Sequence, residues 1–306
     1  TMGYRQMVRQ RTLTPSFQVR ILVASSKPWI VIQGFFLALQ KSALRQKTLR
    51  EDAPGRIPDR QEEKRKITGG RVTMYAFESK VRYSEVGEDT RMTLYSVLNY
   101  FQDCSVFHSE SVGRGTAVQE ELGRAWVLTG WQIEFRRAAD LGESIRISTW
   151  PHGFRGFVGE RNFLMETLDG EVLACADSSW AYIDVKTGHP VKASEEERAA
   201  YPVEEKLDMK PLGRRIRIPE ERQEMGGFTV RQYHLDSNHH VNNAQYIRLS
   251  QEYIPADFQV QRLRAEYKRQ AVLGDQIFPM VSKTEDSYVV ALCNEEKEPY
   301  AVVEFS

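Results

Sequence analysis

An internal repeat constrains the fold of this 306-residue chain more than any other feature of its sequence. Residues 135–145 read FRRAADLGESI, and residues 267–277 read YKRQAVLGDQI, so that five positions are identical. Each copy has the pattern of a strand, a Leu-Gly-acidic turn and a second strand. Such self-similarity indicates a duplicated structural unit.

Each copy follows a stretch with helical periodicity, in which apolar residues are spaced so that one face is buried. These residues are Leu94, Val97, Leu98, Phe101 and Cys104 in the first half, and Val241, Ala244, Ile247 and Ile254 in the second. Strand-like runs follow at 126–135, 144–150, 157–168 and 172–184, and again at 263–267, 276–281, 288–293 and 301–305. The pattern predicts an α+β protein in which each sheet wraps around one long helix.

Charge is unevenly distributed along the chain, although the net charge is zero. Residues 1–73 hold 15 Lys and Arg against 5 Asp and Glu, whereas the rest of the chain holds 27 against 37. We therefore expect a disordered basic extension over 1–73, a first domain over 74–192 and a second over 226–306. The linker at 193–225 alternates acidic and basic clusters and contains prolines that interrupt any helix: Pro202, Pro211 and Pro219.

Three interpretations of the extension are open. A basic, acid-poor segment is typical of a targeting peptide, which would direct the protein to a plastid. Its apolar run at 29–39 is too short to span a bilayer, but a membrane-associating arm is a second interpretation. In the third, the extension is not normally part of the protein, and translation starts at Met74, immediately before the first predicted strand.

The cysteines indicate a reducing compartment, such as the cytoplasm. Cys104, Cys175 and Cys293 are widely spaced and form no C-x-x-C pair, which disfavours a disulfide scaffold or a zinc ribbon. No long apolar segment follows Met74, so we expect no stable membrane insertion. Nothing in the sequence resembles a nucleic-acid-binding motif.

The stretch that says most about chemistry is D-S-N-H-H-V-N-N-A-Q-Y, which starts at Asp236. If its approach is extended, the period of two places Asp236, Asn238 and His240 on one side. A helix then begins, which Asn242 or Asn243 can cap and whose free N–H groups favour negative charge. A base, a positioning amide and an electropositive helix end suit hydrolysis of an acyl compound. The same residue types are also common in turns and caps, so a structural role is the alternative.

The longer string D-x-N-x-H-V-N-N, followed by a helix, resembles the motif of the acyl-acyl-carrier-protein (acyl-ACP) thioesterases, and every defined position is present. The resemblance extends from about Tyr75 to the C-terminus and includes YSEVG at 83–87 and WQIEF at 131–135. It implies two tandem hotdog domains without a cofactor or a metal. It also implies hydrolysis of acyl-ACP to free fatty acid and carrier protein, the step that ends fatty-acid synthesis.

The resemblance also implies roles for the residues of the motif. Asn238 would orient water or substrate, and His240 would accept a proton near neutral pH. Asp236 would hold these groups or act as the base itself. Backbone N–H groups at the start of the helix, at Asn242 and Asn243, would bind the substrate and stabilise the oxyanion.

One position departs from the family pattern, which has a glutamate after the helix in a Tyr-basic-basic-Glu context. Here that position is Gln270, a residue that cannot act as a general base but can hold a water molecule. Glu266 is four residues earlier and, at roughly 3.3 Å per residue, too far away to substitute. The role of base therefore shifts towards Asp236 or His240.

The first half has the stretch EVGEDT at 85–90 where the second half has the reactive motif. Duplication followed by loss of one site fits this difference, and the resemblance suggests that the first half then holds the acyl chain. The candidate acyl-binding residues are Leu94, Val97 and Phe101, for which a plain core is the alternative interpretation.

The implied partner, acyl carrier protein, is acidic, so docking on this acidic body requires a local basic patch. Candidates are the pairs Arg136-Arg137 and Lys268-Arg269 and the run 214–217. A homodimer is also open. The histidines at 234, 239 and 240 lack a cysteine or paired carboxylates at metal-ligand spacing, so no metal site is expected.

Two other functions remain open. A coenzyme A thioesterase of the wider hotdog class is one, because H-V-N-N-A-x-Y recurs there. A non-catalytic acyl-binding module is the other, because Gln270 replaces the acid.

Overall fold

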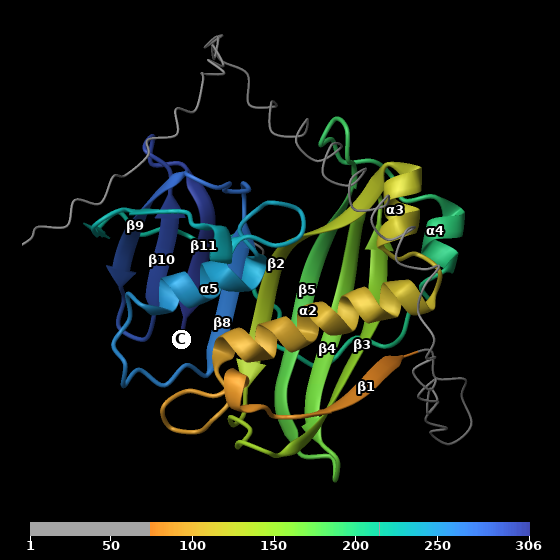
Figure 1. Cartoon of the computed structure of the whole chain (residues 1–306), viewed down its shortest axis with the longest axis horizontal. Coiled ribbons are helices and arrows are strands. Elements are labelled where there is room, and N and C mark those ends of the chain that lie inside the picture. Colours follow the sequence, from red (N-terminus) through yellow and green to blue (C-terminus); the bar gives the residue numbers. More distant parts are fainter. Residues whose placement is uncertain (1–73, 214) are drawn as a thin grey trace, which may run out of the picture.

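The computed structural model describes residues 74–213 and 215–306; the expectations for residues 1–73 and for Arg214 lie outside these ranges. Eleven strands form one antiparallel sheet, and two helices lie across one of its faces (Figure 1). The strand order is β1-β3-β4-β5-β2-β8-β11-β10-β9-β6, and β7 pairs with β9. The two halves of the chain therefore form the two halves of the sheet, and they join where β2 pairs with β8.

The strands follow the predicted runs closely. The first half contributes β1 (Tyr75–Lys80), β2 (Arg124–Phe135), β3 (Ser144–Arg155), β4 (Val158–Thr167) and β5 (Val172–Asp184). The second half contributes β6 (Gln223–Glu224), β7 (Phe228–Thr229), β8 (Arg262–Tyr267), β9 (Gln276–Lys283), β10 (Tyr288–Cys293) and β11 (Pro299–Phe305). The predicted α+β class is confirmed.

The two helices on the sheet differ in length. Helix α2 (Leu94–Ser111) has 18 residues, whereas α5 (Asn243–Gln251) has only 9, so the prediction of a long helix is wrong for the second half. Ile254 lies beyond α5, where its N–H donates to Gln251 O, three residues back. A residue that precedes proline is disfavoured in the α conformation, and Pro255 therefore helps to end the helix.

Shorter helical elements lie outside these two. They are η1 (Tyr83–Glu85), α3 (Thr116–Leu122), α4 (Glu195–Ala199) and η2 (Gln232–His234). No helix within the described residues has both the length and the apolar character needed to cross a bilayer.

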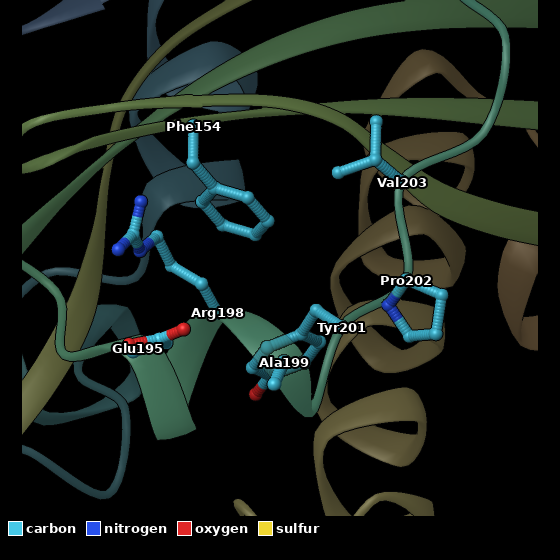
Figure 2. A pocket seen from close by; sticks show the side chains of 7 residues that line it. All are labelled: Phe154, Glu195, Arg198, Ala199, Tyr201, Pro202 and Val203. Atoms are coloured by element: carbon cyan, nitrogen blue, oxygen red, sulfur yellow. The ribbon is translucent and has the colours of Figure 1, made fainter.

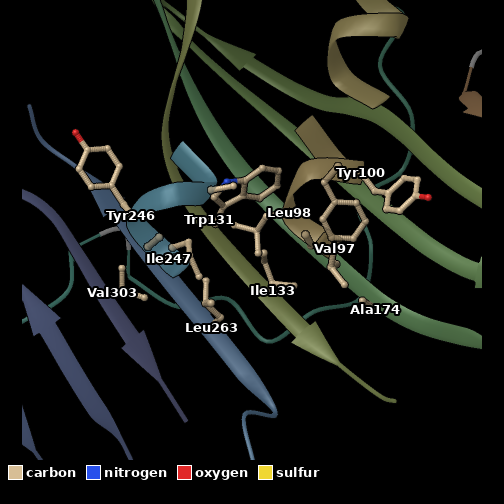
Figure 3. Packing of buried hydrophobic residues seen from close by; sticks show 14 of the residues in the cluster. Val97, Leu98, Tyr100, Trp131, Ile133, Ala174, Tyr246, Ile247, Leu263 and Val303 are labelled. Carbon is tan, nitrogen blue, oxygen red and sulfur yellow. The ribbon is translucent and has the colours of Figure 1, made fainter. Parts of the chain in front are cut away.

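A continuous hydrophobic core runs under both helices. Trp131 and Ile133 on β2 and Leu263 on β8 are at most 4% exposed, and they lie beside Leu98 of α2 and Ile247 of α5 (Figure 3). Burial of each large apolar side chain contributes about 1.5–3 kcal/mol relative to exposure. The core therefore joins the two halves in addition to the strand pairing.

The repeated Leu-Gly-acidic turn has the same structure in both halves. Gly142 and Gly274 adopt positive φ values of 82° and 91°, which only glycine accepts readily. The acidic residue then accepts a hydrogen bond from the backbone N–H three residues earlier: Asp140 N to Glu143 Oε2 at 2.9 Å, and Val272 N to Asp275 Oδ2 at 3.0 Å. The sequence repeat thus preserves a turn that positions residues 140 and 272.

The segment between the halves crosses the sheet on the face opposite the helices. Trp150 Nε1 donates to Glu205 O at 2.8 Å, and Gln132 Nε2 donates to Lys210 O at 2.7 Å. Farther along, the N–H of Ile216 donates to Glu266 Oε2 at 3.1 Å. Side chains of β3, β2 and β8 in turn hold this segment on the sheet.

Candidate active site

The motif forms a closed turn rather than an extended approach. The N–H of Asp236 donates to His240 O at 2.9 Å, and the N–H of His239 donates to Asp236 O at 3.1 Å. His239 has a φ of 62°, and Asp236 Oδ1 accepts the N–H of Asn238 at 2.8 Å. The predicted alternation is therefore wrong, because the chain folds back: Asp236 and His240 lie together, and Asn238 is exposed at the tip.

Asn242 caps helix α5, as one of the two predicted alternatives. Its Oδ1 accepts the N–H of Ala244 at 2.8 Å, and its backbone O accepts that of Gln245 at 2.9 Å. Asn243 takes no part in the cap; its carbonyl oxygen accepts the hydroxyl of Tyr267 at 3.0 Å. The N–H of Asn243 has no hydrogen-bond partner among the described residues, so it remains available at the positive end of the helix.

The turn after β8 packs directly against the motif. His240 and Val272 form an isolated antiparallel bridge, and the N–H of Val241 donates to Ala271 O at 2.9 Å. These two contacts place Gln270 next to Asn242 in the chain that packs against the motif. The structure thus brings Gln270 to the motif, and its side chain is exposed to solvent.

His240 is held in its neutral form. Burial lowers its pKa below the ordinary value of 6.5, the charge of Asp236 partly opposes this shift, and His239 adds to it. Its Nδ1 is buried and has no hydrogen-bond partner among the described residues. A neutral imidazole can accept a proton at neutral pH.

The other ionisable candidates are arranged differently. Glu266 lies on the opposite face of the sheet, where it binds Lys268 and the N–H of Ile216, so it cannot replace the missing acid. His234 Nδ1 accepts the N–H of Arg231 at 3.0 Å. Within the described residues, no group of three or more His, Cys, Asp or Glu side chains could hold a metal ion.

The comparisons with known proteins match both halves. Residues 72–201 match the acyl-ACP thioesterase N-terminal domain, and residues 218–298 match the acyl-ACP thioesterase C-terminal domain. The chain belongs to the acyl-ACP thioesterase family. Its fold, two hotdog units in tandem, is therefore the one that the resemblance implied.

Curated relatives are plant enzymes. The chain is 27% identical, over 67% of its own length, to the oleoyl-acyl carrier protein thioesterase 1 of Arabidopsis thaliana, which is described as chloroplastic. It is 31% identical, over 62% of its length, to the chloroplastic acyl-[acyl-carrier-protein] hydrolase FATB3 of Cuphea viscosissima. The matches span 63% and 50% of these relatives.

Solved structures share the fold. An acyl-ACP thioesterase from Bacteroides thetaiotaomicron superposes with a TM-score of 0.70 at 22% identity, covering 76% of this chain and 96% of that one. The 12:0-ACP thioesterase from Umbellularia californica gives 0.67 at 21% identity, covering 78% and 98%.

The first half of this thioesterase-family chain keeps the shape of the motif without its chemistry. Val86 and Met92 form the bridge that Leu235 and Val241 form in the second half, and Thr90 has a φ of 61° where His239 has 62°. In this alignment the positions of Asp236, Asn238 and His240 are occupied by Gly87, Asp89 and Arg91. Arg91 Nε forms an ion pair with Asp140 Oδ1 at 3.7 Å, so the first half has an arginine where the second half has His240.

The candidate acyl-binding residues lie on or beside the core. Phe101 is fully buried, and its ring centroid is 5.2 Å from that of Phe163 and 6.1 Å from that of Trp131. Val97 is 6% exposed, and Leu94 is partly buried. Acyl binding by these three residues stays a prediction.

Of the three proposed basic patches, the two pairs are neutralised by neighbouring carboxylates, whereas Arg215 and Arg217 of the run 214–217 form no ion pair with a described residue. Arg136 pairs with Glu134, Arg137 with Glu143 and Glu171, Lys268 with Glu266, and Arg269 with Glu298. Arg231 and Arg248 also form no ion pair with a described residue. Burial lowers the pKa of His234, and the charges of these two arginines add to the shift. The two arginines therefore place free positive charge beside the motif.

Two structural supports of the site correspond to no pattern in the sequence. The hydroxyl of Tyr246, on α5, accepts the N–H of Ala271 at 2.9 Å and so fixes the turn that carries Gln270. The hydroxyl of Tyr300 donates to Asp275 Oδ2 at 3.1 Å and steadies the same turn. Tyr246 belongs to the motif, but its partner lies 25 residues away and only the fold reveals it.

Two of the hollows in the described part of the chain lie near helices. The larger, about 530 Å³, lies between α4 and the end of β3, and Phe154, Arg198, Tyr201 and Val203 face it (Figure 2). None of its lining residues belongs to the motif. The smaller, about 330 Å³, lies on α2 and reaches Asn242. The smaller hollow is therefore the better candidate for a substrate site, because its lining includes a residue of the motif.

Proposed function

We propose that this chain hydrolyses acyl-ACP thioesters to free fatty acid and carrier protein, and so ends fatty-acid synthesis. The observation that carries the proposal is the closed turn that holds a neutral His240 beside Asp236, at the positive end of α5. Membership of the family and the match to both of its domains support the substrate class.

In the proposed mechanism, His240 accepts a proton from a water molecule, and the resulting hydroxide adds to the thioester carbonyl. The oxyanion is stabilised by the N–H of Asn243 and the helix end. When the C–S bond breaks, His240 returns the proton to the leaving thiolate. Fatty acid and free thiol are the products.

The other residues of the motif act by positioning. Asp236 raises the proton affinity of His240, because its charge partly offsets the effect of burial. The exposed amides of Asn238 and Gln270 hold the water or the substrate by hydrogen bonds. The acyl chain extends towards Leu94, Val97 and Phe101 in the first half, which retains no reactive set.

Docking of the acidic carrier protein is assigned to Arg231 and Arg248 rather than to the ion-paired arginines. Free positive charge beside the site speeds encounter with an acidic partner and makes it salt-dependent. Replacing both with glutamine is expected to raise KM for acyl-ACP about tenfold and to flatten its dependence on salt. The variant Arg136→Gln is the matched control, because Arg136 is already paired with Glu134.

We place the protein in a reducing compartment, the cytoplasm or a plastid. The cysteines at 104, 175 and 293 are free and buried, which fits such a compartment. The chloroplastic relatives support the plastid, and imaging of the full chain with a C-terminal fluorescent tag distinguishes the two.

The central experiment measures fatty-acid release by the full chain from acyl-ACP and acyl-coenzyme A of several chain lengths, beside His240→Ala. We expect a preference for acyl-ACP and a loss of at least about a hundredfold in kcat for the variant. Preference for coenzyme A would identify a thioesterase of the wider hotdog class. Binding of acyl-ACP without turnover would identify an acyl-binding module.

A further inference from the structure

The smaller hollow, termed here the α2 hollow, lies where the two halves meet. One wall is the face of α2 that carries Tyr95, Asn99 and Gln102, and the opposite edge is Asn242, the cap of α5. Gln245 Nε2 donates to the hydroxyl of Tyr95 at 3.1 Å, so the starts of the two helices are held side by side. Both halves of the chain are therefore needed to form the α2 hollow.

The lining of the α2 hollow contains amides with unused hydrogen-bonding capacity. The side chains of Asn99 and Gln102 are partly buried, and neither has a hydrogen-bond partner among the described residues. Nearby Glu85, in contrast, is satisfied by Arg82 and by the hydroxyl of Tyr100. Partly buried amides without partners favour a ligand that brings its own donors and acceptors.

The α2 hollow also reaches the reaction centre. Asn242 lies two residues from His240 and directly precedes Asn243, whose free N–H marks the proposed position of the oxyanion. A thioester bound there has an apolar acyl end and, on the sulfur side, the arm that carries it. A hollow of about 330 Å³ is within the usual range for small-ligand sites, and its polar lining suits the arm rather than the acyl chain.

We propose that the α2 hollow binds the amide-bearing stretch of the pantetheine arm, with Asn99 and Gln102 as its hydrogen-bonding partners. The arm contains two amides, each with one donor and one acceptor, and these match side-chain amides that also offer both. The first half, which has lost the catalytic set, thus keeps a role in recognition of the leaving group. This inference rests on the proposed thioesterase activity.

The test compares two substrates with the same acyl group: acyl-pantetheine, and the acyl thioester of ethanethiol, which lacks both amides. In the double variant Asn99→Leu/Gln102→Leu, we expect KM for acyl-pantetheine to rise about tenfold, as lost hydrogen bonds of ordinary strength predict. KM for the ethanethiol thioester and kcat for both substrates should change less than about twofold. Leucine is similar in size and favours helix, so α2 should remain folded.

Gln251→Leu is the matched control, because Gln251 is an exposed helical glutamine outside the α2 hollow. It should leave both KM values unchanged. Equal changes for the two substrates in the double variant, or no change, would overturn the assignment of the arm.

Direct binding separates this inference from the proposed activity. Saturation-transfer NMR with pantetheine should show contact in the wild type and a loss of contact in the double variant. If the wild type hydrolyses no thioester but binds pantetheine in this way, only the proposed activity fails. If it hydrolyses acyl-pantetheine but equal binding persists in the double variant, only the proposed site fails.

Discussion

Gln270 is the residue at which we expect this chain to depart from the family pattern, and the structure holds its backbone against the motif. Its backbone is fixed opposite Asn242, because the N–H of Val241 binds Ala271 O and His240 pairs with Val272. We therefore expect a side chain at 270 to lie near the motif whatever its identity.

Restoring the acid is expected to raise activity. In Gln270→Glu, a carboxylate beside His240 can accept the proton of the attacking water, and we predict a gain in kcat of about tenfold or more. Gln270→Ala should lower kcat several-fold, because the water loses a hydrogen bond. Steady-state kinetics on acyl-ACP measure both effects, and full turnover in Gln270→Ala would contradict the positioning role.

The pH dependence of kcat/KM should follow the protonation of His240. Its folded-state pKa lies below 6.5, so the imidazole is neutral and active above that pKa, and activity falls only as the pH drops through it. We therefore predict a kcat/KM profile whose acid limb has its midpoint below 6.5. In Asp236→Asn the limb should move to still lower pH, because the charge that favours protonation is gone.

The same pH experiment distinguishes the two candidate bases. Residual activity in Asp236→Asn with a displaced limb supports His240 as the base. Complete loss of activity in a folded Asp236→Asn protein, judged by circular dichroism, would assign the base to Asp236.

At the level of elements, α5 is hydrogen-bonded to β8 and to the turn after it, and its first residues also provide positive potential. The hydroxyl of Tyr246 accepts the buried N–H of Ala271 and so ties the helix to the turn after β8. The hydroxyl of Tyr267 makes the reverse connection, from β8 to Asn243 O. The two tyrosines fix the helix start relative to Gln270.

Removal of one of these tyrosine hydrogen bonds should affect both stability and catalysis. Tyr246→Phe leaves the N–H of Ala271 buried without a partner, which costs about 1–3 kcal/mol. We expect a lower unfolding free energy in urea and a reduced kcat. Tyr253→Phe is the control, because the hydroxyl of Tyr253 has no hydrogen-bond partner among the described residues; an equal loss in both variants would contradict this role of Tyr246.

At the level of the whole molecule, the pairing of β2 with β8 makes one sheet out of two units. Gly130 sits at this junction, and a Cβ atom placed there would lie 2.9 Å from Ala265 O. The two strands can approach each other only because position 130 has no side chain.

Gly130→Ala should therefore destabilise the whole protein. We predict a loss of about 1–3 kcal/mol from overpacking and a lower Tm by calorimetry. Gly226→Ala is the control, because a Cβ atom there meets no atom within 4 Å. An unchanged Tm in Gly130→Ala would contradict this prediction, because it would show that β2 and β8 can move apart without loss of stability.

Sequence patterns were enough to predict the duplicated α+β architecture, eight of the eleven described strands to within five residues at each end, a helix cap at Asn242 or Asn243, and the position of the motif. These features depend on residues only a few positions apart: the alternation of apolar and polar residues in strands, helical spacing, turn glycines and capping residues. The repeat also provides the strand and turn patterns twice. The failed predictions were also informative. The second helix is short because Pro255 overrides an apolar pattern, and the motif is a closed turn because its backbone bonds to itself.

Which groups face one another became visible only in the folded chain. The fold brings the turn that carries Gln270 to the motif, binds Glu266 to Lys268 and to the N–H of Ile216, pairs Arg136 with Glu134 and leaves the amide of Asn99 without a partner among the described residues. Such contacts join residues far apart in sequence, and they depend on strand register and on the crossing of the two helices. Spacing along the chain does not encode these contacts. The residue types of the site could therefore be predicted from the sequence, but their arrangement in space could not.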